Sequence, residues 1–205
     1  MTTQLVVRLL RAAVALLGAT ALTVNLIHAL DVPSFRLINY FSYFTNLSNI
    51  FAVVTLAVGA LHDPASRRWE LVRGAATFCT TVTGIIYALF LADVSVGVTD
   101  PWINTVIHRI VPAFMLLDWW LVARAPVDPR RALRWLAIPV VYLAYTLIRG
   151  PLADDWYPYP FLDPTRDGGY LRVALFSAAV AIALALLTFG LSKLGGRHRE
   201  VAARA

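Results

Sequence analysis

Residues Tyr40–Phe51 (YFSYFTNLSNIF) open a long apolar segment, yet five of them carry hydroxyl or amide side chains: Ser42, Thr45, Asn46, Ser48 and Asn49. On a helix, Ser42, Thr45 and Asn49 are spaced i, i+3 and i+7, so they are expected to share one face. Lipid offers no hydrogen-bond partners, and a polar stripe on a membrane helix therefore needs polar neighbours or water. The stripe predicts that other parts of the chain bring polar groups to the same depth.

The composition is that of a membrane protein. Of 205 residues, 59% are apolar and 15% are charged, and the mean hydropathy is +0.67. Soluble domains have about 45–50% apolar and about 25% charged residues. The single cysteine, Cys79, lies in an apolar run, which excludes an intrachain disulfide, a Cys-x-x-Cys pair and a thiolate metal cluster.

Apolar segments near the ~20 residues that a helix needs to cross a bilayer recur along the chain. Proline- and aspartate-containing breakers separate them, and the first is too long for a cleaved signal peptide. No internal repeat or second domain is evident. We predict an all-α, polytopic membrane protein, in which residues 1–205 form a single domain, a six-helix transmembrane bundle with spans at about 7–30, 40–61, 72–94, 102–123, 133–149 and 170–194.

The basic residues give this bundle an orientation. Thirteen of the 18 lie at the start of the first span, in or beside alternate connections and in the C-terminal tail, and the positive-inside rule then places both termini in the cytoplasm. The net charge of +6 is thus explained by topology, and no nucleic-acid partner is expected. The opposite face is acidic and holds the longest connection, 150–169, whose aromatic residues predict an ordered cap: Trp156, Tyr157, Tyr159 and Phe161.

With this topology, five of the six spans bring polar groups to one layer in the outer leaflet: Asn25, His28, Thr45, Asp93, His108 and Arg149. Pro112 lacks the N–H that would bond the carbonyl of His108, so the helix should kink or open there. Ordinary structural roles remain open for each group. Thr45 and its neighbours would serve helix packing, Asn25 and His28 would be end-of-helix residues, and Arg149 would pair with a loop aspartate. Asp118, near the cytoplasmic end, is expected to pair with an arginine.

Most familiar catalytic sites are absent from the sequence. There is no His-Glu-x-x-His, no metal-spaced cluster, no glycine-rich phosphate loop and no Gly-x-Ser-x-Gly elbow, so neither a metal nor a cofactor is expected. A hydroxyl nucleophile with a histidine base remains. The Thr45 hydroxyl needs a neighbouring base to attack an acyl carbon, and neutral His108 is suited to take and return the proton. The amides of Asn46 or Asn49 are candidates to polarise the carbonyl oxygen.

Three runs carry a family resemblance: Trp102–Asp118 (WINTVIHRIVPAFMLLD), Ile85–Asp93 (IIYALFLAD) and Trp156–Asp163 (WYPYPFLD), together with Phe44-Thr45. The first resembles the fourth-helix signature of the androgen-induced protein family, which includes the androgen-dependent regulator of tissue factor pathway inhibitor. Animal members are multi-span threonine hydrolases of fatty acid esters of hydroxy fatty acids. The resemblance implies Thr45 as nucleophile and His108 as base.

This chain departs from the animal members in being shorter and rich in alanine and arginine, which suggests a bacterial member, in the cytoplasmic membrane. Its fifth span ends in Arg149, where the animal proteins tend to have histidines. The resemblance therefore bears on the site more than on the substrate.

The leading functional hypothesis is an integral-membrane lipid ester hydrolase, a threonine-nucleophile carboxylic ester hydrolase with a Thr45/His108 dyad in an outer-leaflet cavity. Its partner is a membrane lipid or lipophilic ester. Supporting roles are assigned to Ser42, Asn46, Asn49 and His28, to Asp93 in orienting the histidine, and to Arg149 in holding a substrate carboxylate. The alternative is a non-catalytic membrane protein that binds or transports a lipid or small molecule, and transport would need access from both faces.

Overall fold

The computed structural model describes residues 3–92, 94, 100–122 and 127–194. Every element in this part of the chain is a helix, so the all-α prediction is confirmed. In chain order the elements are α1 (Thr3–Leu30), α2 (Leu37–Tyr40), α3 (Phe44–Leu61), α4 (Arg67–Ile86), the π-helix η1 (Tyr87–Leu91), α5 (Pro101–Thr105), the π-helix η2 (Val106–Ile110), α6 (Val111–Leu121), α7 (Pro129–Ala132), the 3-10 helix η3 (Leu133–Leu136), α8 (Ala137–Leu152), the 3-10 helix η4 (Pro160–Leu162) and α9 (Gly169–Leu194).

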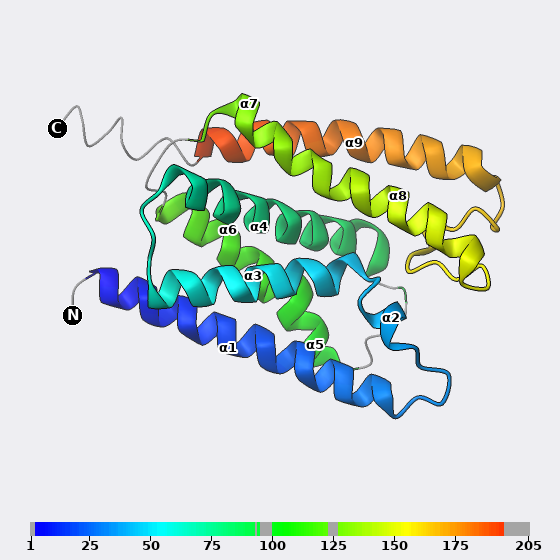
Figure 1. The fold of residues 1–205 in the computed structure, drawn as a ribbon, viewed down its shortest axis with the longest axis horizontal. Helices are drawn as coiled ribbons and strands as arrows, with labels where there is room; N and C mark the ends of the chain where they lie inside the picture. The colour runs from blue at the N-terminus through cyan, green and yellow to red at the C-terminus, as the bar shows by residue number, and fades with distance from the viewer. Residues whose placement is uncertain (1–2, 93, 95–99, 123–126, 195–205) are drawn as a thin grey trace.

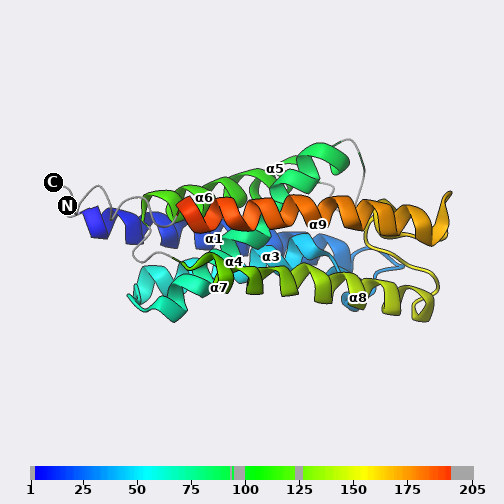
Figure 2. The same ribbon diagram turned by 90° about the horizontal axis from the view of Figure 1, so that it is seen from above.

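The helices form an elongated bundle that the chain traverses back and forth (Figure 1). We call the end where α1, α4 and α7 begin and α9 ends the arginine-rich end, and the end with α2 and residues 153–168 the aromatic end. Helix α1 packs along α3, and α3 and α6 pack on α4. Seen from above, α8 runs along one side of the view, α5 and α6 lie along the other, and α9 runs between them, as Figure 2 shows.

Five helices are long and apolar enough to cross a membrane: Thr3–Leu30, Phe44–Leu61, Arg67–Leu91, Pro129–Leu152 and Gly169–Leu194. The sixth expected span, at about 102–123, corresponds to α5, η2 and α6, which together form one continuous helical run. This run is less apolar because it carries His108, Arg109 and Asp118. Its length nevertheless matches that of its neighbours, and it traverses the bundle in the same way (Figure 1).

The side chains are distributed as in a membrane protein. Large apolar residues point outward on α1, α8 and α9, with Leu16 at 70% exposure and Leu186 at 69%. Polar residues lie inside, including Asn25, Thr45 and His108. An exposed apolar surface together with a polar interior is stable where the surroundings are hydrocarbon, because lipid cannot satisfy hydrogen-bonding groups.

The start of the second span differs from the sequence-based expectation, which placed it at about residue 40. The structure ends α2 at Tyr40 and begins α3 at Phe44. Ser42 lies in the turn between them, where its hydroxyl donates to the carbonyl of Ile38 at 2.7 Å. Ser42 and Thr45 therefore do not lie on one helix face, because the side chain of Ser42 stabilises a change of chain direction instead of a helical turn.

A buried ion network joins three helices toward the arginine-rich end. The Asp118 carboxylate accepts bonds from Arg11 Nε at 2.7 Å and from Arg73 Nη2 at 2.8 Å. Arg73 also donates to Glu70 at 2.9 Å, and Arg11 donates to Asp63 at 2.9 Å. Arg11 is only 1% exposed, so its charge depends on these partners. The expectation that Asp118 pairs with an arginine is confirmed, and the network ties α1, α4 and α6 together.

Replacing Asp118 with Asn should destabilise the protein by about 3–5 kcal/mol, because two buried arginines lose the carboxylate that they share. The measurement is the free energy of unfolding of purified protein in mixed micelles, titrated with a denaturing detergent. Asp154→Asn is the matched control. Asp154 pairs with Arg36 at the surface, where both side chains are more than half exposed, so a loss of about 0–1 kcal/mol is expected. Equal losses from the two variants would contradict this account.

Candidate active site

Thr45 is the second residue of α3, at a helix start that has no side-chain cap. The first N–H groups of a helix have no partner inside the helix and must find one elsewhere. The backbone N–H of Thr45 donates to the hydroxyl of Tyr159, with 3.2 Å between the two atoms. Tyr159 comes from the connection between α8 and α9, so this connection folds back into the bundle and covers the beginning of α3.

His108 lies in the π-helix η2, four residues before Pro112. Because Pro112 has no N–H, the helix widens locally, and the N–H of Val111 donates to the carbonyl of Val106. The opening predicted from Pro112 is therefore confirmed. Gly84 of α4 makes it possible to pack this turn closely. A Cβ at Gly84 would lie 3.2 Å from the Cβ of Pro112 and 3.4 Å from the carbonyl oxygen of His108.

The side chains of Thr45 and His108 meet inside the bundle. Thr45 Oγ1 lies 3.4 Å from His108 Nε2, and both residues are buried. The other ring nitrogen, Nδ1, lies 3.2 Å from the backbone carbonyl of Asn104. A carbonyl only accepts hydrogen bonds, so in the neutral ring Nδ1 carries the proton. The lone pair of Nε2 then faces the Thr45 hydroxyl, as a general base requires.

Tyr87 holds the imidazole ring from one face. The two rings are stacked with their centroids 4.1 Å apart and an interplanar angle of 19°. The Asn104 side chain donates to the Tyr87 hydroxyl at 2.6 Å. Asn104 thus fixes both the tautomer of His108, through its backbone, and the position of Tyr87, through its side chain. No carboxylate is needed for either role.

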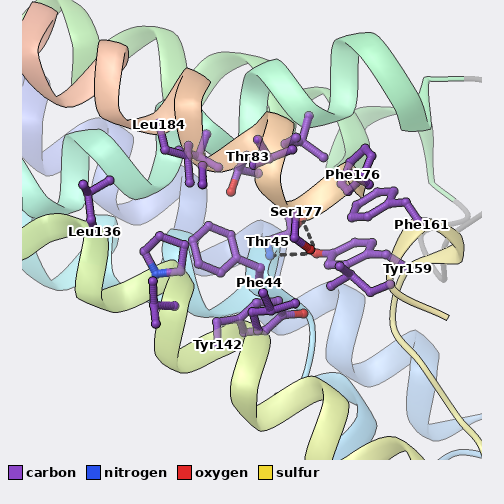
Figure 3. Close-up of a pocket in the computed structure, with 18 of the residues that line it drawn as sticks. Phe44, Thr45, Thr83, Leu136, Tyr142, Tyr159, Phe161, Phe176, Ser177 and Leu184 are labelled. Carbon is purple, nitrogen blue, oxygen red and sulfur yellow. Dashed lines mark hydrogen bonds between the residues drawn. The ribbon is translucent and has the colours of Figure 1, made fainter. Parts of the chain in front are cut away.

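A cavity of about 220 Å³ reaches Thr45 from the side away from His108. Figure 3 shows Thr45 and Tyr159 at one part of its wall, between side chains of α8 and α9. Its lining is almost entirely apolar and includes Phe44, Val82, Leu143, Phe176 and Leu184. Val140 also lines the cavity and is 64% exposed, so the cavity reaches the outer surface of the bundle. The arrangement suits an alkyl chain with a reactive group at Thr45.

The amides expected beside Thr45 are used within the protein. Asn46 Nδ2 donates to the carbonyl of Tyr40 at 2.8 Å, away from His108. Asn49 Nδ2 donates to the carbonyls of Thr45 at 2.8 Å and Ile107 at 2.9 Å. Asn49 therefore connects α3 to η2 and holds the two candidate catalytic residues in register.

The remaining predicted site residues do not converge on Thr45. Ser42 Oγ bonds the Tyr145 hydroxyl at 2.7 Å, and His28 pairs with Asp100 at 2.6 Å while half exposed. Arg149 donates to Asn39 at 2.5 Å and lies over the Trp156 ring. Asp93 lies outside the described residues. Among the residues described, no three His, Cys, Asp or Glu side chains are placed to hold a metal ion.

The sequence interpretation missed Tyr159 and Asn104 as parts of the site. Tyr159 was expected only in an interfacial cap, and Asn104 had no assigned role. The one available signal was the spacing of Asn104 and His108, which is a single helical turn and allows a side chain to bond the backbone of residue i−4. Nothing in the local sequence places the hydroxyl of Tyr159 at the start of α3.

Comparisons with known proteins add no relative: no family model, curated protein or solved structure matches this chain. The site therefore has to be interpreted from its own geometry.

Replacing Asn49 with Leu, which has a similar shape, should lower the free energy of unfolding by about 1–3 kcal/mol, because the buried carbonyls of Thr45 and Ile107 each lose a hydrogen bond. Denaturing-detergent titration in micelles provides the measurement. Ser192→Ala is the control. Among the described residues the Ser192 hydroxyl bonds only a carbonyl of its own helix, that of Phe189, and its loss should cost about 1 kcal/mol or less. An Asn49→Leu protein as stable as the unmodified one would show that Asn49 does not connect α3 to η2.

Proposed function

We propose that this chain is an integral-membrane lipid ester hydrolase in which Thr45 is the nucleophile and His108 is the general base. The observation that carries the proposal is the 3.4 Å approach of Thr45 Oγ1 to His108 Nε2, with Nδ1 held by a backbone carbonyl. This separation is longer than the about 2.6–3.2 Å of a formed catalytic hydrogen bond, and such contacts commonly tighten as the reaction proceeds. The resemblance to the androgen-induced protein family selects the same two residues.

The reaction begins with attack of Thr45 Oγ on the ester carbonyl carbon. The Thr45 proton passes to His108 Nε2, and the carbonyl π-electron pair moves onto oxygen. Collapse of this intermediate breaks the carbon–oxygen bond to the alcohol, which leaves with the proton from His108. Water then attacks acyl-Thr45 in the same way. Its proton passes to His108 and on to the departing Thr45 Oγ, and the fatty acid is released.

The membrane arrangement belongs to this proposal. The α5–η2–α6 run crosses the bilayer as the sixth span, and the arginine-rich end faces the cytoplasm with both termini. The aromatic end then lies at the outer leaflet. In this arrangement a lipophilic ester, such as a fatty acid ester of a hydroxy fatty acid, enters from the membrane between α8 and α9. The proposal gives Arg149, at the same end, the role of holding a free carboxylate on such a substrate.

A lipid-binding or transport protein is the second candidate, favoured by the almost wholly apolar lining of the cavity. Lipid binding without hydrolysis predicts that Thr45→Val keeps its ligand and that the unmodified protein cleaves no ester. Transport predicts uptake into proteoliposomes without ester cleavage.

The hydrolase proposal is tested with full-length protein in nanodiscs, using p-nitrophenyl octanoate and a fluorophosphonate label. Thr45→Val should abolish hydrolysis and labelling, whereas Thr45→Ser keeps a hydroxyl and should retain both. His108→Gln should lower kcat by about 10²–10⁴-fold through loss of the base. Thr55→Val, on the same helix and also buried, should match the unmodified protein. Hydrolysis that survives both Thr45→Val and His108→Gln would contradict the dyad.

A further inference from the structure

Tyr159 is held firmly against the start of α3. Its side chain is 5% exposed. Its ring is stacked on Phe161 with the centroids 5.2 Å apart, and the edge-to-face contact with Tyr43 has a centroid distance of 5.8 Å. Aromatic contacts on two sides fix the ring, so the position of the hydroxyl is set before a substrate arrives.

The hydroxyl of Tyr159 meets two atoms of the same residue. It accepts the N–H of Thr45 at 3.2 Å and lies 3.3 Å from Thr45 Oγ1 (Figure 3). Since the Thr45 hydroxyl donates toward the lone pair of His108 Nε2, the proton between the two hydroxyls belongs to Tyr159. The two hydroxyl hydrogens then point in one direction, that of Tyr159 to Thr45 Oγ1 and that of Thr45 to His108 Nε2.

The surroundings of the Tyr159 oxygen keep the phenol protonated. Burial raises the pKa of the Tyr159 phenol to about 12, while the backbone N–H groups of Thr45 and Phe44 act in the opposite direction. The phenol therefore keeps its proton at neutral pH and acts as a donor. The N–H groups of the α3 N-terminus are directed at the same point and add a positive partial charge.

Tyr159 lies on the side of Thr45 from which a substrate would come. Thr45 and Tyr159 both line the cavity, whereas His108 does not. Two other hydroxyls in the lining are already used as donors: Tyr142 donates to the carbonyl of Ser42 at 2.8 Å, and Thr83 to that of Cys79 at 3.1 Å. The Ser177 hydroxyl on α9 also lines the cavity, but among these hydroxyls only that of Tyr159 contacts Thr45. The side-chain N–H groups of Asn46 and Asn49 are bonded to backbone carbonyls as well.

From this geometry we infer that Tyr159 is a third catalytic residue, whose hydroxyl and the backbone N–H of Thr45 together form the oxyanion hole of the proposed hydrolase. The inference rests on the proposed Thr45/His108 chemistry. As Thr45 Oγ bonds the carbonyl carbon and its proton moves to His108, the electron pair of the C=O bond moves onto oxygen. Tyr159 turns its O–H from Thr45 Oγ to this oxygen and keeps its proton throughout.

The test uses full-length protein in nanodiscs, with p-nitrophenyl octanoate as substrate. Tyr159→Phe should lower kcat by about 10²–10³-fold, as removal of one oxyanion-hole donor does elsewhere, while KM changes by about threefold or less. Tyr43→Phe, which removes a hydroxyl from the same aromatic cluster, is the matched control and should keep kcat within about twofold.

A transition-state analogue separates a catalytic Tyr159 from a merely structural one. An octyl trifluoromethyl ketone adds to Thr45 Oγ and carries an oxyanion, whereas the corresponding methyl ketone binds mainly as the ground state. Tyr159→Phe should weaken binding of the trifluoromethyl ketone by about the same factor by which it lowers kcat/KM. The affinity for the methyl ketone should be almost unchanged. Equal weakening of both ketones would mean that Tyr159 only shapes the cavity, and the inference would fail.

The remaining outcomes distinguish this inference from the hydrolase proposal. Full activity in Tyr159→Phe, with none in Thr45→Val, overturns the role of Tyr159 and leaves the dyad in place. If Ser177→Ala lowers kcat and Tyr159→Phe does not, the oxyanion-hole donor lies on α9 and the role of Tyr159 is overturned. The Ser177 hydroxyl has no partner among the described residues. Activity in Thr45→Val removes the basis of both proposals.

Should Tyr159→Phe fail to fold, 3,5-difluorotyrosine at position 159 keeps the size and the hydroxyl of the natural residue. Fluorination lowers the pKa of the phenol, so kcat should decline at alkaline pH as the donor loses its proton, while the unmodified protein shows no such decline. An unchanged pH profile would overturn the inference.

Discussion

A hydrocarbon environment supplies no hydrogen bonds, and most of the arrangement of this bundle follows from that constraint. Every polar group on the long helices must find a partner inside the protein or lie at an end. Two clusters of the described residues answer to this constraint. Arg11, Arg73 and Asp118 form a charged cluster toward the arginine-rich end, and Thr45, His108 and Tyr159 form a neutral cluster nearer the aromatic end. The first binds helices together, whereas the second lies beside a cavity.

The neutral cluster is built where regular helices are interrupted. Thr45 is the second residue of α3, His108 lies in a π-helical turn, Tyr87 lies in another, and Tyr159 comes from a connection. A regular helix uses all its backbone N–H and C=O groups internally, except at its ends. Interruptions leave such groups available for side chains and, in the proposed reaction, for a substrate. The Thr45 N–H and the Asn104 carbonyl are the two backbone groups that the proposed chemistry uses.

Access to Thr45 is consistent with a ligand that comes from the membrane. Helix α9 packs on α7 and η3 toward one end and on η4 at the other, and the cavity lies between α8 and α9 (Figure 3). These two helices bury the smallest share of their side chains among the candidate spans. Helices with few neighbours separate at little energetic cost, because apolar side chains exchange contacts with protein for equally apolar contacts with lipid.

The amino-acid sequence by itself determined the helical class, the approximate ends of most helices, the opening of the helix at Pro112 and the pairing of Asp118 with arginine. These features depend on apolar run length, on the missing N–H of proline and on the cost of an unpaired buried charge, all of which are properties of local sequence. Sequence placed Thr45 and His108 at similar depth, and the resemblance selected them as a pair.

The tertiary structure decided that Thr45 Oγ1 and His108 Nε2 meet at 3.4 Å and that Tyr159 reaches Thr45. It also decided that Ser42 turns away and that the amides of Asn46 and Asn49 donate to backbone carbonyls. Such contacts depend on helix rotation and on the path of a connection, and a rotation of a few tens of degrees leaves the apolar pattern unchanged while it separates two side chains completely.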